Sequence, residues 1–240
     1  MSISVKKIMR VLCAGGLLAV GALNANAAAS SLAAAAGAIA WTPANSHRLY
    51  EIFHNNQTVA EFVNETLPTE DQGLEPLSVG EYRIIDLNND GHLQLVCTVD
   101  VTGRAFYTGL VVFSQQNGRI VRSDTSTGNG ANLNDLGSSI VDINHDGRKE
   151  ILVPRLLGPY SGSRPVGRVV DVFKVRNGQM VKANQEFSGY YRDTLLPQLK
   201  SKLDSLIQHP ERSSNAETAR QEKMSVVQKE IDAVEKLAAR

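Results

Sequence analysis

The 240-residue chain has little of what supports disulfide bonding, nucleic-acid binding or a membrane span. It has two cysteines, Cys13 and Cys97, and its 25 basic residues balance 25 acidic ones, so the formal net charge is zero. A balanced charge gives no reason to expect nucleic acid as a partner. The apolar run near the N-terminus, residues 11–23, is short for a transmembrane helix. The composition therefore indicates a globular protein with additional segments at its ends.

The first 27 residues have the organisation of an export signal. Three basic residues precede the apolar run, and Ala25-Asn26-Ala27 supplies small residues for cleavage. We expect a signal peptide over 1–27 and a secreted or periplasmic mature protein without a stable transmembrane anchor. The Ala-rich stretch 31–40 leaves an uncleaved anchor as the alternative. Cys13 lies inside the signal, so the mature chain can form no intramolecular disulfide, and Cys97 is expected to be a buried, inert thiol.

Two short loops carry acidic and amide side chains at alternate positions, with a glycine at position 6. Oxygen ligands at this spacing let one turn of chain wrap a hard cation, and they suit calcium. Positions 1, 3, 5 and 9 offer side chains, and position 7 offers a backbone carbonyl. The first loop, residues 86–94, supplies Asp86, Asn88, Asp90, His92 (carbonyl) and Gln94. The second loop, residues 142–150, supplies Asp142, Asn144, Asp146, Arg148 (carbonyl) and Glu150.

The two loops differ in charge. The second has three carboxylates and the first has two, so we expect calcium to bind more tightly in the second. The alternative is a metal-free turn, because Asp and Asn hydrogen-bond their own backbone and Gly accepts a positive φ. His92 and His145 have no second His or Cys at ligand spacing, so they are expected to face solvent rather than bind a transition metal.

The segments around the loops repeat. Strands expected at 80–85 and 92–99 flank the first loop, and strands at 138–142 and 149–156 flank the second. A hairpin follows each pair and turns at Asn117-Gly118 or Asn177-Gly178. The loops begin 56 residues apart and the turns lie 60 apart. A repeated unit of four strands is the plan of a propeller blade.

The remaining segments set the domain boundaries. We expect residues 28–46 to be a flexible N-terminus, residues 48–63 to form a β-hairpin turning at Asn55-Asn56, and residues 64–80 to form a loop. The hairpin would be half a blade, so residues 47–188 would hold two to two-and-a-half blades. A propeller needs about four blades to close. An open stack, a sheet sandwich and closure by self-association therefore remain as alternatives.

Residues 189–240 change to helical periodicity. Leucines from 195 to 206 line one face of a helix that ends before Pro210, and a second helix follows residues 213–215. Both helices either pack on the chain's own sheets or form an oligomerisation tail.

The repeat resembles the FG-GAP family, whose units build the N-terminal propeller of integrin alpha chains and many bacterial surface proteins. Residues 136–159, LGSSIVDINHDGRKEILVPRLLGP, are similar to one such unit, and the resemblance extends over residues 77–187. It implies a mainly β fold with calcium held between the first two strands of each blade. An EF-hand is not indicated, because position 12 is Cys97 or Val153 instead of Glu and the flanks are strand-like.

These observations predict an exported, non-catalytic calcium-binding protein that acts as a binding or scaffold module for a protein or glycan partner. One alternative is a hydrolase or enzyme accessory subunit, which would need an acidic cluster outside the loops. Candidates for such a cluster are Asp100, Asp124, Asp135 and Asp171. The other alternative is a self-assembling structural protein, a homo-oligomer.

Overall fold

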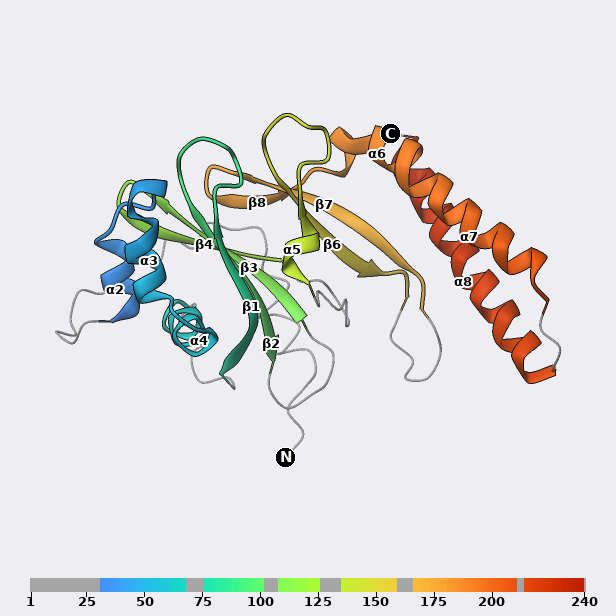
Figure 1. Ribbon diagram of the computed structural model, residues 1–240, viewed down its shortest axis with the longest axis horizontal. Coiled ribbons are helices and arrows are strands. Elements are labelled where there is room, and N and C mark those ends of the chain that lie inside the picture. The colour runs from blue at the N-terminus through green and yellow to red at the C-terminus, as the bar shows by residue number, and fades with distance from the viewer. Residues whose placement is uncertain are drawn as a thin grey trace.

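The computed structural model describes residues 31–67, 76–101, 108–125, 135–158, 166–210 and 214–239. In these residues, helices at both ends of the chain flank two four-stranded antiparallel sheets (Figure 1). The expected signal peptide, residues 28–30 and residues 68–75 of the predicted loop 64–80 lie outside the described residues. The two ends of that predicted loop are wrong, because residues 64–65 end a helix and residues 77–80 begin a strand.

Both sheets follow the same path, in which each strand pairs with the next one along the chain. The first sheet contains β1 (Leu77–Ile85), β2 (Gln94–Val101), β3 (Thr108–Gln116) and β4 (Arg119–Thr125). The second contains β5 (Ile140–Val141), β6 (Glu150–Leu156), β7 (Arg168–Arg176) and β8 (Gln179–Lys182). The predicted repeat is thus confirmed as two meanders of four strands. The strand expected at 138–142 is shorter, because a one-turn helix, α5 (Leu136–Ser139), begins where Asp135 accepts a hydrogen bond from the Ser138 backbone.

Both predicted Asn-Gly turns are confirmed. Asn117 and Gly118 have φ of 50° and 73° between β3 and β4, and Asn177 and Gly178 have φ of 48° and 71° between β7 and β8. Two consecutive positive φ values define the type I′ turn, whose twist matches that of the flanking strands. These dipeptides therefore determine where each hairpin reverses.

The hairpin predicted at 48–63 is wrong, because this stretch forms two helices, α3 (Ser46–Ile52) and α4 (Asn56–Glu65). The Asn55 side chain accepts a hydrogen bond from the Thr58 backbone and the Thr58 side chain reaches back to Asn55, which makes a capping box. Val59, Phe62 and Val63 are completely buried, at helical spacing. The segment is therefore not half a blade.

The flexible N-terminus expected at 28–46 is also wrong for its described part, residues 31–46. This part forms α2 (Leu32–Gly37) and a 3₁₀ turn, η1 (Pro43–Asn45), and it buries Ala36, Ile39 and Trp41. The Trp41 indole nitrogen donates to the Ala36 carbonyl, and the Gln115 side chain of β3 binds the backbone at Gly37, Ile39 and Trp41. Alanines that show no clear periodicity in the sequence are ordered here by contact with the first sheet.

The core has three layers. The first lies between the N-terminal helices and one face of the first sheet, where Trp41, Phe53, Phe62 and Phe113 form a series of edge-to-face contacts. Cys97 belongs to this layer, and its complete burial raises the pKa of the thiol to about 12, as expected of an inert cysteine.

The second layer lies between the two sheets, where side chains such as Val96 and Val112 of the first sheet meet Ile151 and Val153 of the second. The third lies between the second sheet and the C-terminal helices and includes Val172, Tyr191 and Val234. Each sheet therefore has one face on the other sheet and one face on helices (Figure 1). Two sheets that are covered in this way bury their apolar faces without further blades.

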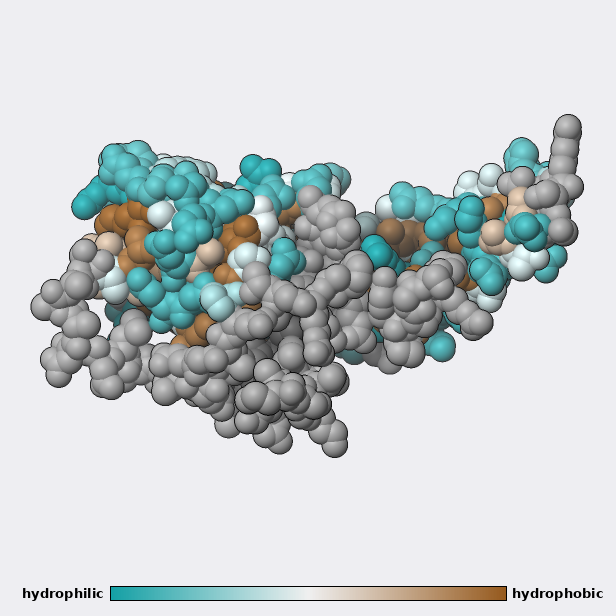
Figure 2. Space-filling model, turned by 90° about the horizontal axis from the view of Figure 1, so that it is seen from below, coloured by the Kyte–Doolittle hydropathy of each residue, from teal (hydrophilic) through white to brown (hydrophobic). Residues whose placement is uncertain are grey.

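The C-terminal helices follow the expected pattern. After η3 (Asn184–Phe187), α6 (Ser188–Tyr190) and a π-helical turn, η4 (Tyr191–Leu195), the chain forms α7 (Leu196–Gln208) and α8 (Ser214–Ala238). Their inner ends pack on the second sheet, and the α7–α8 hairpin projects from the body with a mostly hydrophilic surface (Figure 2). No helix in the described part of the chain is both long and apolar enough to cross a membrane.

Candidate metal centre

The two loops have the same backbone conformation. Asn89 and His145 at position 4 have φ of 55° and 59°, and Gly91 and Gly147 at position 6 have φ of 80° and 85°. The first loop joins β1 to β2, and the second joins β5 to β6. Glycine adopts positive φ without steric cost, and Asn and His are among the other residues found there most often, so the sequence pattern explains this shape locally.

The aspartate at position 1 organises each loop. Asp86 accepts hydrogen bonds from the backbone of Asp90 (3.2 Å) and Gly91 (2.8 Å). Asp142 does the same for Asp146 (3.1 Å) and Gly147 (2.9 Å). In each aspartate, each carboxylate oxygen accepts from one N–H group, so local hydrogen bonds hold both loops in the turned conformation.

The aspartate at position 5 accepts from the backbone two residues later. This bond is 2.9 Å from His92 to Asp90 and 2.8 Å from Arg148 to Asp146. Asp146 also accepts from the Asn144 amide at 3.0 Å. The Arg148 N–H and the Asn144 amide hold the pKa of Asp146 below its usual value, so this carboxylate is ionised at neutral pH.

The histidines lie at the surface of the loops. His145 and His92 are both exposed. This agrees with the expectation that they face solvent.

The loops differ at position 9, where the side chain is buried in both. Gln94 is 3% exposed and makes two hydrogen bonds inside its loop. Its Oε1 accepts from the Leu87 backbone at 2.8 Å, and its Nε2 donates to the His92 carbonyl at 2.7 Å. The amide thus satisfies both of its ends within the first loop.

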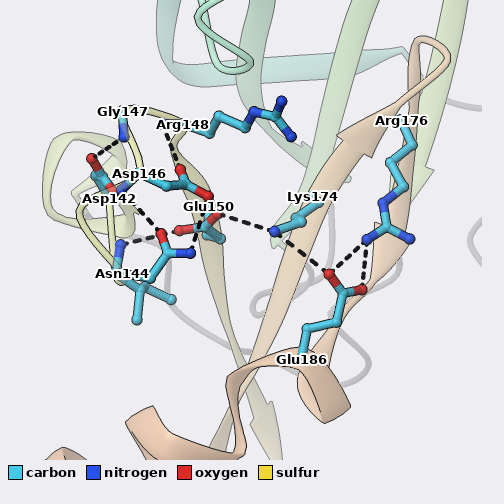
Figure 3. A network of polar contacts seen from close by, with 10 residues as sticks. Asp142, Asn144, Asp146, Gly147, Arg148, Glu150, Lys174, Arg176 and Glu186 are labelled. Carbon is cyan, nitrogen blue, oxygen red and sulfur yellow. Dashed lines mark hydrogen bonds and ion pairs between the residues drawn. The ribbon is translucent and has the colours of Figure 1, made fainter.

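Glu150 is completely buried, and only one of its oxygens has a hydrogen-bond partner among the described residues. Oε2 accepts from the Ile143 backbone at 3.0 Å, as Gln94 does from Leu87. Oε1 has no donor, and the Lys174 ammonium lies 3.8 Å from it (Figure 3). A buried carboxylate oxygen without a donor costs free energy unless a cation or a water molecule completes its contacts.

The electrostatics of Glu150 support the same interpretation. Burial raises the pKa of this carboxyl, and the charges of Asp146 and Asp142 raise it further. The Ile143 N–H and Lys174 act in the opposite direction, but the pKa remains above its usual value. Burial, with a smaller contribution from the neighbouring carboxylates, therefore makes the ionised form of Glu150 costly unless a positive group compensates it.

A small cavity with several basic residues in its lining lies beside this carboxylate. This cavity of about 60 Å³ is lined by Glu150, Arg148, Lys149, Lys174, Arg176 and Asn88. That is room for a water molecule or an ion. Lys174 also lies 3.5 Å from Glu186, which Arg176 binds at 2.6 Å (Figure 3). Lys174 thus stands between Glu150 and the segment that begins the C-terminal helices.

Backbone contacts link each loop to the preceding part of the chain. In the second loop, Lys149 donates to the Leu87 carbonyl of the first loop at 2.7 Å. In the first loop, Leu93 donates to the Trp41 carbonyl at 2.8 Å. Both donors occupy position 8 of their loop, so Trp41 makes for the first loop the contact that Leu87 makes for the second.

The residues of the second loop fit a hard cation. Asp142, Asn144, Asp146 and Glu150 offer side-chain oxygen atoms of the kind that bind calcium, and Glu150 Oε1 has no hydrogen-bond donor among the described residues. In the part of the chain that the structure describes, no three His, Cys, Asp or Glu side chains converge closely enough to form a ready-made cluster. The carboxylates of Asp142 and Asp146 point instead toward N–H groups, so their role as ligands stays a prediction.

The acidic residues proposed for a second site have other contacts. Asp124 binds Arg122 (2.9 Å), and Asp135 caps α5. Asp171 is buried and accepts from Lys182, Arg155 and the Asn184 amide. Asp100 lies on β2. The contacts of Asp124, Asp135 and Asp171 are therefore ion pairs and hydrogen bonds within the fold.

The sequence interpretation missed Lys174 and Glu186. Lys174 lies three residues before the Asn177-Gly178 turn. Pairing β7 with β6 from that turn would have placed it opposite Glu150, because Ile151 pairs with Phe173. Glu186 follows the last strand, and no sequence pattern near it indicated that it would lie close to the second loop.

Comparisons of the chain with protein-family models, with curated proteins and with solved structures found no match.

Proposed function

We propose that this chain is an exported, non-catalytic calcium-binding module, in which one calcium ion in the second loop stiffens a binding or scaffold surface. The ligands would be the side chains of Asp142, Asn144, Asp146 and Glu150 with the Arg148 carbonyl. Calcium prefers such oxygen ligands, and extracellular modules bind it with dissociation constants of about 0.1 to 1 mM.

One observation carries this proposal: Glu150 Oε1 is buried without a hydrogen-bond donor among the described residues, and burial, together with the charges of Asp146 and Asp142, raises the pKa of its carboxyl. A metal-free turn would not require a carboxylate at this position. The glutamine of the first loop closes the same turn with both of its polar atoms satisfied.

The two sheets support the further proposal that they are propeller-type blades related to FG-GAP repeats. Each is a four-stranded meander with its acidic loop between the first two strands. Side chains from the two sheets pack face to face, as neighbouring blades do. In this interpretation the helices α2–α4 and α6–α8 take the places of the missing neighbours.

The ion's role would be structural. It would hold β5 to β6 through Asp142 and Glu150, and the Lys149 contact with Leu87 would pass this restraint to the first sheet. A surface formed by both loops would then be rigid only when calcium is bound. The signal-like residues 1–27 would deliver the chain to a compartment where millimolar calcium fills so weak a site.

Calorimetric titration of the mature chain, residues 28–240, with calcium tests the proposal. We expect one site with a dissociation constant of about 0.1 to 1 mM. At about 10 mM calcium the melting temperature should rise by roughly 3 to 10 °C over that in chelator, from about 1.4 to 2.7 kcal/mol of binding linkage.

Magnesium at the same concentration is the control. It should give a smaller shift, because it demands closer octahedral geometry and gives up its water reluctantly. A wild-type chain with no calcium binding and with equal melting temperatures in calcium and chelator would overturn the proposal.

A further inference from the structure

We infer that the Gln94 amide takes the place of a cation in the first loop, so that the residue at position 9 decides whether a loop binds metal. This inference rests on the proposed calcium site in the second loop. According to this inference, the first loop binds no metal because its own residue at position 9 is Gln94.

The hydrogen bonds of the Gln94 and Glu150 side chains support this replacement of a cation by an amide. In both loops one oxygen of residue 9 accepts from the backbone of residue 2, at 2.8 Å in Gln94 and 3.0 Å in Glu150. The other atom differs. Gln94 Nε2 donates to the carbonyl of residue 7, His92, at 2.7 Å, whereas Glu150 Oε1 has no donor among the described residues.

The carbonyl of residue 7 is one of the atoms that a calcium ion would bind in such a loop. In the first loop the positive end of the Gln94 amide already satisfies this carbonyl. In the second loop the corresponding side-chain atom is an oxygen, which cannot donate to the Arg148 carbonyl. By analogy with the first loop, the Arg148 carbonyl and Glu150 Oε1 would both be acceptors there, and a cation would satisfy both at once.

The residue opposite position 9 on the neighbouring strand differs between the two loops in the same way. Ser114 is the register partner of Gln94 on β3, so a neutral residue faces a neutral one. Lys174 on β7 faces Glu150, so a positive charge faces a negative one. The first loop therefore buries a neutral side chain at position 9, whereas the second loop buries a carboxylate whose Oε1 has the Lys174 ammonium at 3.8 Å and no hydrogen-bond donor among the described residues.

Exchange of the two residues tests the inference. Glu150→Gln should bind no calcium, and in chelator it should melt roughly 2 to 6 °C above the wild type, because the new amide can donate where Glu150 leaves an acceptor unsatisfied. Gln94→Glu should melt below the wild type in chelator and should bind two calcium ions. The double exchange should bind one ion, held in the first loop.

Exposed positions provide matched controls. Gln198→Glu on α7 adds the same charge away from the loops, and Glu235→Gln on α8 removes one. Neither should change the number of calcium ions bound. Titration calorimetry gives this number, and thermal unfolding in chelator and in about 10 mM calcium gives the stability.

The outcomes separate the two proposals. A wild type that binds no calcium overturns the proposed function, whereas a wild type that binds two ions overturns only the inference. A destabilised Glu150→Gln in chelator also overturns the inference, since the amide then fails to replace the cation. If Gln94→Glu does not fold even in calcium, the sign of the Glu150→Gln shift still decides the question.

Discussion

The two sheets share one backbone plan but differ in the polar side chains that they bury. The first sheet buries Gln94, Thr98 and Ser114, which are neutral, and the second buries Glu150 and Asp171, which are acidic. Local sequence shapes both loops in the same way, through an aspartate at position 1 and glycine at position 6. The difference teaches that loop shape and loop chemistry are separable: local hydrogen bonds hold both turns in the same shape, whereas only the second loop buries a charged side chain at position 9.

The largest expected effect contrasts the aspartates at position 1. Asp142→Ala and Asp86→Ala each remove the acceptor of two backbone N–H groups, which should cost about 1 to 3 kcal/mol of unfolding free energy. In about 10 mM calcium, Asp142→Ala should also lose the binding linkage, for a total of about 3 to 5 kcal/mol. Urea unfolding in calcium and in chelator measures both. Equal losses in calcium would show that the two loops do not differ in metal binding.

An intermediate effect concerns Asp171 and pH. Burial raises the pKa of Asp171, but hydrogen bonds from Lys182 and Asn184 and the charges of Lys182 and Arg155 outweigh burial and lower it overall. The stability from this group is therefore complete above the unfolded-state pKa of about 3.9, and it is lost as pH falls through the lower folded-state pKa.

Asp171→Asn should cost about 2 kcal/mol at pH 7 and should flatten the decline in stability below about pH 4. Hydrogen exchange of β6 and β7 should show this loss of protection before β2 and β3 do. Asp204→Asn, at an exposed site on α7, is the control and should leave the acid transition unchanged. If both sheets of the wild type lose protection at the same pH, the buried Asp171 does not make the second sheet more sensitive to acid than the first.

The smallest effect concerns Lys174, whose counterpart beside Gln94 is the neutral Ser114. Lys174→Met removes the ammonium from Glu150 (3.8 Å) and Glu186 (3.5 Å), and it should cost about 1 kcal/mol in chelator. Calcium should bind roughly fivefold more tightly, because a positive charge near the site is gone. Lys200→Met, which removes an exposed ion pair with Glu235, is the matched control. Unchanged calcium affinity in Lys174→Met would exclude Lys174 as a competing charge.

The sequence allowed correct prediction of the features whose causes are local. Asn117-Gly118 and Asn177-Gly178 form the predicted turns because these residues adopt positive φ at little cost. The leucines of α7 and the apolar residues of α8, such as Val227 and Val234, form helices as their spacing indicated. The sequence also shows the additional carboxylate of the second loop, Glu150, whereas its effect on calcium binding stays a prediction.

The errors concern segments whose structure depends on distant partners or on competing local signals. Residues 48–63 alternate enough to suggest strands, but Asn55 and Thr58 form a helix cap, and Phe62 packs against Phe53 and against Phe113 of the first sheet. The Ala-rich segment before Trp41 is ordered by Gln115, more than 70 residues away. No spacing within these segments reveals such contacts.

The sequence by itself determined the shape of both loops, the two Asn-Gly turns and the repeat of four strands, because short-range hydrogen bonds and φ preferences need only neighbouring residues. Tertiary structure decided the rest. Helices cover the outer faces of the two sheets, so the fold needs no further blades. Burial turns the difference between Gln94 and Glu150 into a difference in unsatisfied charge, because an oxygen without a donor is costly only where water cannot reach it.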